Sequence, residues 1–490
     1  MLEKQRLVKR FADEVVESFI TPLLEGQREL FNAIQFINKA HAVMLIEQKI
    51  VSEDDGKKIL KALFDVDKLG KSAPLNPYLH EIYSNIESKV IEWIGADVGG
   101  RMMTGRSRND LYACAFRIVV REQILDIMNE VTGTIETLVN QAEKHYDTVM
   151  PGFTHTQPAQ PTTLGHYFLG LVDSLDEDRT RLKDAYNRTN RNPLGAAAFA
   201  GTGFFLNRKL TTELMCFKGV VENSIKSVGD YSYFLETLSS LAIMMNNVSR
   251  FMADLVPWTS SVYGMFEIDD SFACTSSIMP QKKNPFTAET MRAMAGEIAG
   301  SLMQGLTITK GIPMGFNFDL LCFGGWSLNH MRDVKKAMRV LKGLVATMVV
   351  HKDAMEQRSW DGFSTATELA DRLVRSKGMS FRTAHGVIAA AVRMAIEAGK
   401  NSLDAELINL AAKEVLNKDI DFKEEIGVNV AQIVASRKSA GSGAPKEVMR
   451  MVKSRRKFIA TEKDSLEKEF RRISNGQASL DRLIKDNFAI

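Results

Sequence analysis

The positions of the twelve prolines constrain the fold of this 490-residue chain more than any other feature. They leave three long stretches without proline, at residues 78–150, 194–256 and 314–444. Proline breaks a helix interior because it lacks an N–H and its ring collides with the preceding turn. Long, uninterrupted helices are therefore permitted in these three stretches.

Apolar residues recur at steps of three and four in two of these stretches. One series runs from Asp230 to Pro257 through Phe234, Leu238, Leu241, Met245, Val248 and Met252, and residues 111–145 show the same spacing. This periodicity predicts amphipathic helices, and a helix of about 27 residues is roughly 40 Å long. Rods of that length predict an all-α protein built around a helical bundle.

Composition and charge narrow the possible functions. The chain is 45% hydrophobic and 25% charged, as is typical of soluble globular proteins. Its net charge of +3 is too small to indicate a nucleic acid or a membrane surface as partner. No apolar run is long enough to span a membrane, and the charged residues 1–16 do not resemble a signal peptide. The four cysteines lack CxxC spacing, which favours a reducing, cytoplasmic setting without structural zinc.

A chain of this length exceeds what one hydrophobic core usually supports. We expect three helical domains: an N-terminal domain over 1–110, a long-helix bundle over 111–360 and a C-terminal domain over 361–490. Within the last domain, the glycine- and serine-rich segment 437–445 is interpreted as a surface loop.

The first polar segment of interest is Thr-Gly-Arg-Ser-Arg-Asn-Asp at 104–110. We expect Asp110 to cap a helix that begins near Leu111. The partial positive charge of that helix end would lie beside Arg106 and Arg108, which suits a carboxylate or a phosphate. A capped loop on the protein surface is the structural alternative.

The second segment, 152–166, reads GFTHTQPAQPTTLGH. Its prolines stiffen an irregular stretch, so His155 is expected on a fixed loop where it can carry a proton. A hydrogen-bonded structural histidine is the alternative, and His166 on the following helix is interpreted as packing. Because no metal-binding spacing such as HExxH occurs, we expect no metal site.

The third segment, 273–285, reads ACTSSIMPQKKNP and contains two prolines and no glycine. It is predicted to be an irregular loop rather than a glycine-rich phosphate loop. Its serines, lysines and asparagine could stabilise a negatively charged reaction centre, with one serine moving a proton. Cys274 is interpreted as packing rather than as a nucleophile. A solvated basic surface loop is the alternative for the whole segment.

Together and in this order, TGRSRND, GFTHTQPAQP and TSSIMPQKKNP resemble the argininosuccinate lyase branch of the fumarase and aspartase superfamily. Segments 80–87, 194–202, 267–272 and 368–385 also resemble that branch. The resemblance implies a homotetramer whose central helices form a twenty-helix bundle, with each active site built from loops of three subunits. It also implies a small-molecule substrate and an elimination that needs no cofactor.

For such a family the reaction is anti elimination of an amine from an N-substituted aspartate, which releases fumarate. The resemblance implies that Ser276 removes the proton, with Ser277 as the neighbouring alternative. Lys282 and Asn284 would hold the aci-carboxylate that develops, because fixed positive charge and donors stabilise it.

The resemblance also assigns the amine and carboxylate contacts. His155 would donate or relay a proton to the leaving amine, with Thr154 beside it, and the succinyl carboxylates would be bound by Ser107, Arg108 and Asn109. Which of Ser276 and His155 is the base and which the acid is left open by the sequence.

The segment 316–324 departs from the family. Argininosuccinate lyases typically read YNRDLQEDK there, whereas this chain has Phe316, Leu321 and Gly324 in place of tyrosine, glutamine and lysine. A buried polar head group would lose about 1–3 kcal/mol for each missing contact. We therefore expect an amine other than arginine, as in lyases that split ethylenediamine disuccinate.

Three alternatives to this expectation remain. Compensating residues could still support cleavage of argininosuccinate itself. The chain could also be a catalytically silent structural protein, like the delta crystallins of this branch, although Ser276, His155, Lys282 and Asn284 are all retained. An adenylosuccinate-type substrate is disfavoured because the loop sequences follow a different pattern.

Overall fold

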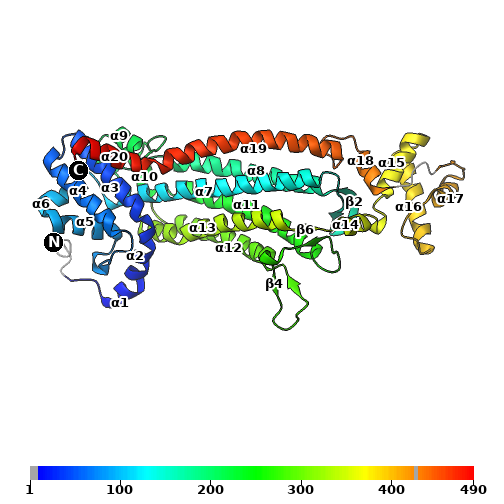
Figure 1. Cartoon of the computed structure of the whole chain (residues 1–490). Coiled ribbons are helices and arrows are strands. Elements are labelled where there is room, and N and C mark those ends of the chain that lie inside the picture. The colour runs from blue at the N-terminus through cyan, green and yellow to red at the C-terminus, as the bar shows by residue number, and fades with distance from the viewer. Residues whose placement is uncertain (1–8, 424–428) are drawn as a thin grey trace.

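The computed structural model describes residues 9–423 and 429–490. The chain forms an elongated helical rod with a helical cluster at each end (Figure 1). Strands within these described residues are confined to three two-stranded ribbons, which confirms the predicted all-α class. No helix in the same part of the chain is long and apolar enough to cross a membrane.

The N-terminal cluster packs around the buried helix α3. Its elements are α1 (Asp13–Val15), α2 (Thr21–Gln27), α3 (Phe31–Glu47), α4 (Glu53–Leu69), α5 (Ile82–Ile94) and α6 (Ala96–Gly99). Helix α3 is buried on nearly all faces, since α4, α7 and α9 (Arg208–Leu214) all contact it. This cluster therefore joins directly onto the rod.

Five long helices make up the rod: α7 (Arg108–Lys144), α8 (Leu164–Thr189), α11 (Ser232–Trp258), α12 (Phe286–Thr309) and α13 (Phe318–Thr347). The helices predicted at 111–145 and 230–257 are confirmed as α7 and α11. Leu238, Leu241 and Met245 of the periodic series are fully buried. Pro257 lies inside the last turn of α11 rather than beyond it. Because the helix ends one residue later, at Trp258, an irregularity at Pro257 affects few backbone hydrogen bonds of the helix.

The cluster at the other end has its own small core. It contains α15 (Ala366–Lys377), α16 (Phe381–Glu397) and α17 (Ala405–Leu416), and Leu373, Val387 and Ile408 lie in its centre. The short helices α14 (Lys352–Arg358) and α18 (Val430–Ala435) connect it to the rod. Division of the chain into three domains stays a prediction.

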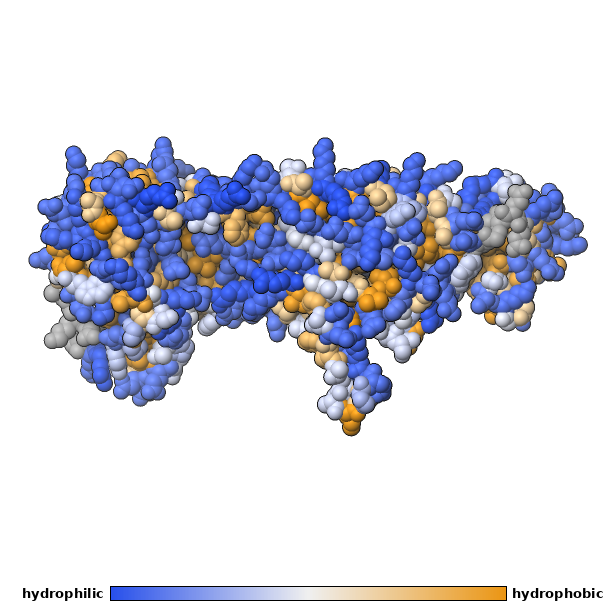
Figure 2. Space-filling model, viewed as in Figure 1, coloured by the Kyte–Doolittle hydropathy of each residue, from blue (hydrophilic) through white to orange (hydrophobic). Residues whose placement is uncertain are grey.

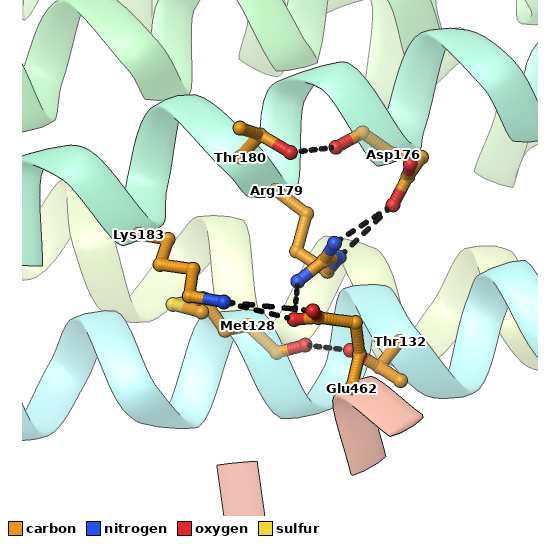
Figure 3. A network of polar contacts seen from close by, with 7 residues as sticks. All are labelled: Met128, Thr132, Asp176, Arg179, Thr180, Lys183 and Glu462. Carbon is orange, nitrogen blue, oxygen red and sulfur yellow. Dashed lines mark hydrogen bonds and ion pairs between the residues drawn. The ribbon is translucent and has the colours of Figure 1, made fainter. Parts of the chain in front are cut away.

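The last 46 residues leave this cluster and return along the rod. Helix α19 (Pro445–Ser474) packs on α7 and α8, and α20 (Gly476–Phe488) reaches α3 of the N-terminal cluster. Figure 3 shows Glu462 of α19 meeting Arg179 and Lys183 of α8, while Arg179 also binds Asp176 at 3.0 Å. The C-terminal helix is thus held along the rod by charged contacts as well as by apolar ones.

Of the two segments expected to be irregular, 152–163 forms a regular hairpin, whereas 273–285 is largely an irregular loop, as expected, closed by two strands of two residues each. Strand β1 (Val149–Thr154) pairs with β2 (Gln157–Thr163), and β4 (Cys274–Thr275) pairs with β5 (Lys283–Asn284). The third ribbon joins β3 (Phe266–Glu267) to β6 (Val349–Val350). Prolines fit the β1–β2 ribbon because each strand has one free edge, where a missing N–H breaks no ladder bond, whereas Pro280 and Pro285 lie outside β4 and β5.

Candidate active site

The first predicted site segment forms the start of α7. Ser107 is the N-cap, and its side chain accepts from the Asn109 N–H at 3.3 Å. Asp110 accepts in return from the Ser107 N–H at 2.9 Å, which completes a capping box. The predicted N-cap, Asp110, is therefore wrong: the serine three residues earlier does the capping.

Asp110 also fixes a neighbouring loop to this helix end. Its second oxygen accepts from the N–H groups of Gly195 at 2.9 Å and Ala197 at 3.0 Å, and Asn109 donates to the Ala198 carbonyl at 3.0 Å. Burial raises the pKa of Asp110 to about 6, against the opposing effect of these N–H donors. The start of α7 and the loop at 194–202 consequently form one rigid unit.

The two arginines of this segment face different surroundings. Arg106 is buried, and its Nε and Nη1 have no partner among the described residues. Arg108 is exposed, and its Nη1 lies 3.5 Å from Glu81, whose side chain is buried. Burial raises the pKa of Glu81, while Arg108 opposes that shift. Of the two guanidinium groups, only Arg108 is open to a ligand.

The second site segment lies at the opposite end of α7. Thr154 and His155 are exposed at the tip of the β1–β2 hairpin. Because α7 has 37 residues, about 55 Å separates its two ends. Phe153 packs against Trp258 and Tyr263, with ring centroids 5.9 and 5.8 Å apart, so this hairpin is anchored on the end of α11.

His166, interpreted from the sequence as packing, makes two polar contacts. Its Nδ1 lies 2.8 Å from the Thr162 hydroxyl and its Nε2 lies 2.9 Å from the Gly441 carbonyl. These bonds join the hairpin to the glycine- and serine-rich segment 437–445. No spacing in the sequence indicated this contact, because the two segments are 275 residues apart.

The third site segment is the β4–β5 hairpin, which projects sideways from the rod (Figure 1). A hydrophobic spot marks its very end, with hydrophilic residues around it (Figure 2), and Ile278 is 82% exposed. Ser276 accepts from the N–H groups of Ile278 at 3.3 Å and Met279 at 3.0 Å. Ser277 is exposed, and its side chain has no hydrogen bond to the described residues.

The paired lysines of this hairpin differ in their contacts. Lys283 binds Glu267 at 2.9 Å and Asp270 at 2.6 Å. Lys282 is exposed and forms no ion pair with the part of the chain that the structure describes. Asn284 lies 3.9 Å from the sulfur of Cys274, which is exposed rather than packed as expected. Lys282 is thus the lysine left available to a ligand.

The segment expected to recognise the amine is only partly open. Leu321 is buried in the main core, and a side chain at Gly324 would lie 2.7 Å from the Phe116 ring. Phe316 is half-buried. Two of the three substitutions therefore turn toward the chain's own core, where a long polar side chain has no room.

One chain does not bring the three segments together. They lie at the start of α7, at the far end of the rod and on a projecting hairpin (Figure 1). Within residues 9–423 and 429–490, no group of three or more histidine, cysteine or acidic residues could hold a metal ion. The predicted roles of the site residues stay predictions.

Two protein families match the chain. The Lyase family matches residues 6–300, and the family described as Argininosuccinate lyase C-terminal matches residues 363–435. Curated relatives extend this likeness over nearly the whole sequence. The argininosuccinate lyase of Methanosarcina mazei is 41% identical over 96% of this chain and 97% of its own length. That of Methanocaldococcus jannaschii is 37% identical over 96% of both chains.

Solved structures agree with these relatives. EDDS lyase in complex with formate superposes with a TM-score of 0.87 and 31% identity, covering 98% of this chain and 97% of that one. The class II fumarase of Schistosoma mansoni shares the fold, with a TM-score of 0.69 and 16% identity over 89% of this chain and 94% of that one. Family matches, sequence relatives and fold together show that this chain belongs to the argininosuccinate lyase branch of the fumarase and aspartase superfamily.

Proposed function

We propose that this protein eliminates an amine other than arginine from an N-substituted aspartate and releases fumarate. Its family makes it a carbon–nitrogen lyase that forms fumarate, and a variant of the similar EDDS lyase has been solved with bound fumarate. The family does not identify the amine, so that part of the proposal depends on the residues of this chain.

Ser276 is proposed as the base. Removing a proton beside a carboxylate builds a second negative charge on that carboxylate, so the step needs an activated base and fixed positive charge. The two backbone N–H groups that donate to Ser276 Oγ favour its ionised form. Lys282, which lacks an ion pair with the described residues, and Asn284 would then hold the aci-carboxylate.

The remaining roles fall to groups outside this hairpin. His155 would give a proton to the leaving amine, and Thr154 would contact the substrate. Ser107, Arg108 and Asn109 would bind the succinyl carboxylates, because exposed guanidinium and the positive end of a long helix both favour anions. The capping box and Asp110 would keep these groups in place before substrate arrives.

A complete site would require other copies of the chain. About 55 Å of helix separates Arg108 from His155, and a succinyl group is far too small to touch both. We therefore propose a homotetramer in which each site takes loops from three subunits. Mixing inactive Ser276→Ala and His155→Ala proteins under subunit exchange should restore part of the activity, whereas sites formed within one chain would stay inactive in the mixture.

The single observation that favours an amine other than arginine is the loss of polar groups at 316–324. Phe316, Leu321 and Gly324 offer no hydrogen bond from their side chains, and the last two face the core. An aminocarboxylate such as ethylenediamine disuccinate fits this expectation. The test incubates the enzyme with fumarate and arginine, ethylenediamine or aspartate and follows fumarate absorbance in both directions.

Genuine argininosuccinate lyase activity is the second candidate. It is favoured by the 41% identity to a curated protein of that name. If arginine is the only amine accepted, this second candidate is correct and the proposal of a different amine is wrong. Turnover with another amine, and none with arginine, would support the primary proposal.

A further inference from the structure

The base of the β1–β2 hairpin is tied to a loop that comes from the other end of the sequence. We call residues 437–444 the C-terminal loop. The carbonyl of Gly441 can only accept, so Nε2 of His166 carries the hydrogen of that 2.9 Å contact. Nδ1 is then free to accept from the Thr162 hydroxyl at 2.8 Å. One imidazole therefore makes both bonds and bridges hairpin and loop.

Direct contact of the C-terminal loop with the hairpin reinforces this bridge. The buried hydroxyl of Thr163 donates to the Gly443 carbonyl at 3.1 Å. A Cβ added to Gly443 would lie only 2.3 Å from the Thr162 hydroxyl oxygen. The loop backbone thus lies against the end of β2, with no space for even a methyl group between them.

The tip of the same hairpin carries His155 in an unusual backbone conformation. His155 and Thr156 have φ values of 52° and 61°, the left-handed region that a two-residue hairpin turn requires and that β-branched residues avoid. Neither residue is glycine, so the surrounding structure must hold this turn. A two-stranded ribbon alone is only marginally stable.

Several elements support the hairpin, from its base to the residues next to its tip. Helices α14 and α18 pack on β1, and the turn at Asp361–Phe363 packs on β2, where Gly362 approaches Pro158. All of these lie after residue 350 in the sequence. His166 is the side chain that links this later part of the chain to the hairpin by hydrogen bonds at both ring nitrogens.

We propose that His166 is a positioning residue: it fixes the hairpin that carries His155 by tying it to the C-terminal loop. The inference rests on the proposed function of His155 as the proton donor. Reacting groups must be held close to their productive geometry, and a 1 Å displacement can lower a rate by about 10²-fold. The C-terminal region would then serve proton transfer without touching the substrate.

The experiment compares His166→Ala with His166→Gln in the full-length enzyme, using the amine that the wild type accepts. His166→Ala should lower kcat by roughly 10- to 100-fold and change KM less than kcat, since Ser107, Arg108 and Asn109, which would bind the carboxylates, lie elsewhere and only Thr154 shares the hairpin. The amide introduced by His166→Gln can still donate to the Gly441 carbonyl, so this variant should recover most of the lost kcat. A purely structural role would change the yield of folded enzyme but not kcat per folded site.

Two further variants test the bridge from its other side. Gly443→Ala should push the C-terminal loop off Thr162 and reproduce the kcat loss without altering any histidine. Ser439→Ala is the matched control, because Ser439 is exposed on the same loop and its side chain forms no hydrogen bond with the described residues. It should behave as wild type.

Amide hydrogen exchange over residues 149–163 supplies a readout independent of turnover. Exchange there should accelerate in His166→Ala and Gly443→Ala and stay unchanged in Ser439→Ala. Wild-type kcat in both bridge variants, or wild-type exchange in both, would overturn the positioning role while leaving the proposed function intact. Failure of the wild type to turn over any amine would instead overturn the proposed function, and the positioning role with it.

Discussion

The start of α7 and the β4–β5 hairpin carry two of the three groups of residues in the proposed chemistry, and they are built in opposite ways. At the start of α7, Ser107 and Asp110 close a capping box, and the buried Asp110 also holds a second loop through two N–H groups. The hairpin projects from the rod, and among the described residues Ser276 bonds only to backbone within its own turn. The fold of one chain therefore fixes the positions of the side chains at the start of α7. It does not determine which groups surround Ser276 on the projecting hairpin.

Because of this difference, we expect substitutions in the two regions to affect stability and turnover unequally. The start of α7 is part of the folded core, so a substitution there is expected to reduce stability as well as binding. The hairpin contributes little buried surface of its own, so a substitution there should reduce turnover and leave stability nearly unchanged.

Substitution of the proposed base should have the largest effect on turnover. Ser276→Ala is expected to lower kcat by about 10³-fold or more, because the proton acceptor is gone. The free energy of unfolding should change by less than about 1 kcal/mol, since only bonds within an exposed turn are lost. Fumarate absorbance and urea unfolding measure the two effects. Ser277→Ala is the matched control, and an equal loss of kcat in that variant would contradict the assignment of Ser276.

Loss of the buried carboxylate at the start of α7 should give the opposite result. Asp110→Ala leaves the N–H groups of Ser107, Gly195 and Ala197 without their acceptor. We expect a loss of about 2–4 kcal/mol in the free energy of unfolding, from urea titration. Asp319→Ala, at an exposed position in the first turn of α13, should cost about 0.5 kcal/mol or less. Similar losses in both variants would contradict the proposed anchoring.

The two neighbouring lysines allow a finer separation within the hairpin. Lys282→Met should lower kcat/KM by about 10²-fold, because a positive charge facing the aci-carboxylate is removed. Lys283→Met should keep kcat/KM within about fivefold, since Lys283 already binds Glu267 and Asp270. Steady-state kinetics in the fumarate-forming direction measure kcat/KM for both variants. The reverse order would place Lys283 in the site instead.

The smallest expected effect concerns Glu81 beneath Arg108 and depends on pH. Burial raises the folded-state pKa of Glu81, so its contribution to stability is full below the unfolded pKa of about 4.3 and is lost as pH rises through the raised value. Glu81→Gln does not titrate and should therefore gain stability relative to wild type as pH increases from 4 toward 7. Urea unfolding at several pH values tests this, and a difference that stays constant with pH would refute it.

Much of the architecture could be predicted because it depends on local pattern. Gaps between prolines and the three- and four-residue spacing of apolar side chains located α7 and α11 to within a few residues. The β1–β2 hairpin was missed because its proline-rich segment does not show alternating hydrophobicity, and its pairing uses only backbone groups. The cap of α7 was misplaced because both Ser107 and Asp110 have suitable side chains, and the sequence does not show which one binds which N–H.

Sequence alone predicted long helices packed in a bundle and showed serine, lysine, histidine and arginine in segments typical of one lyase family. Periodicity and composition carry that information because they act over neighbouring residues. The folded structure was needed to show that Lys283 is already paired, that Leu321 and Gly324 face the core, and that His166 reaches a loop 275 residues away. Contacts between distant segments depend on how the helices pack in space, and no local pattern records that packing.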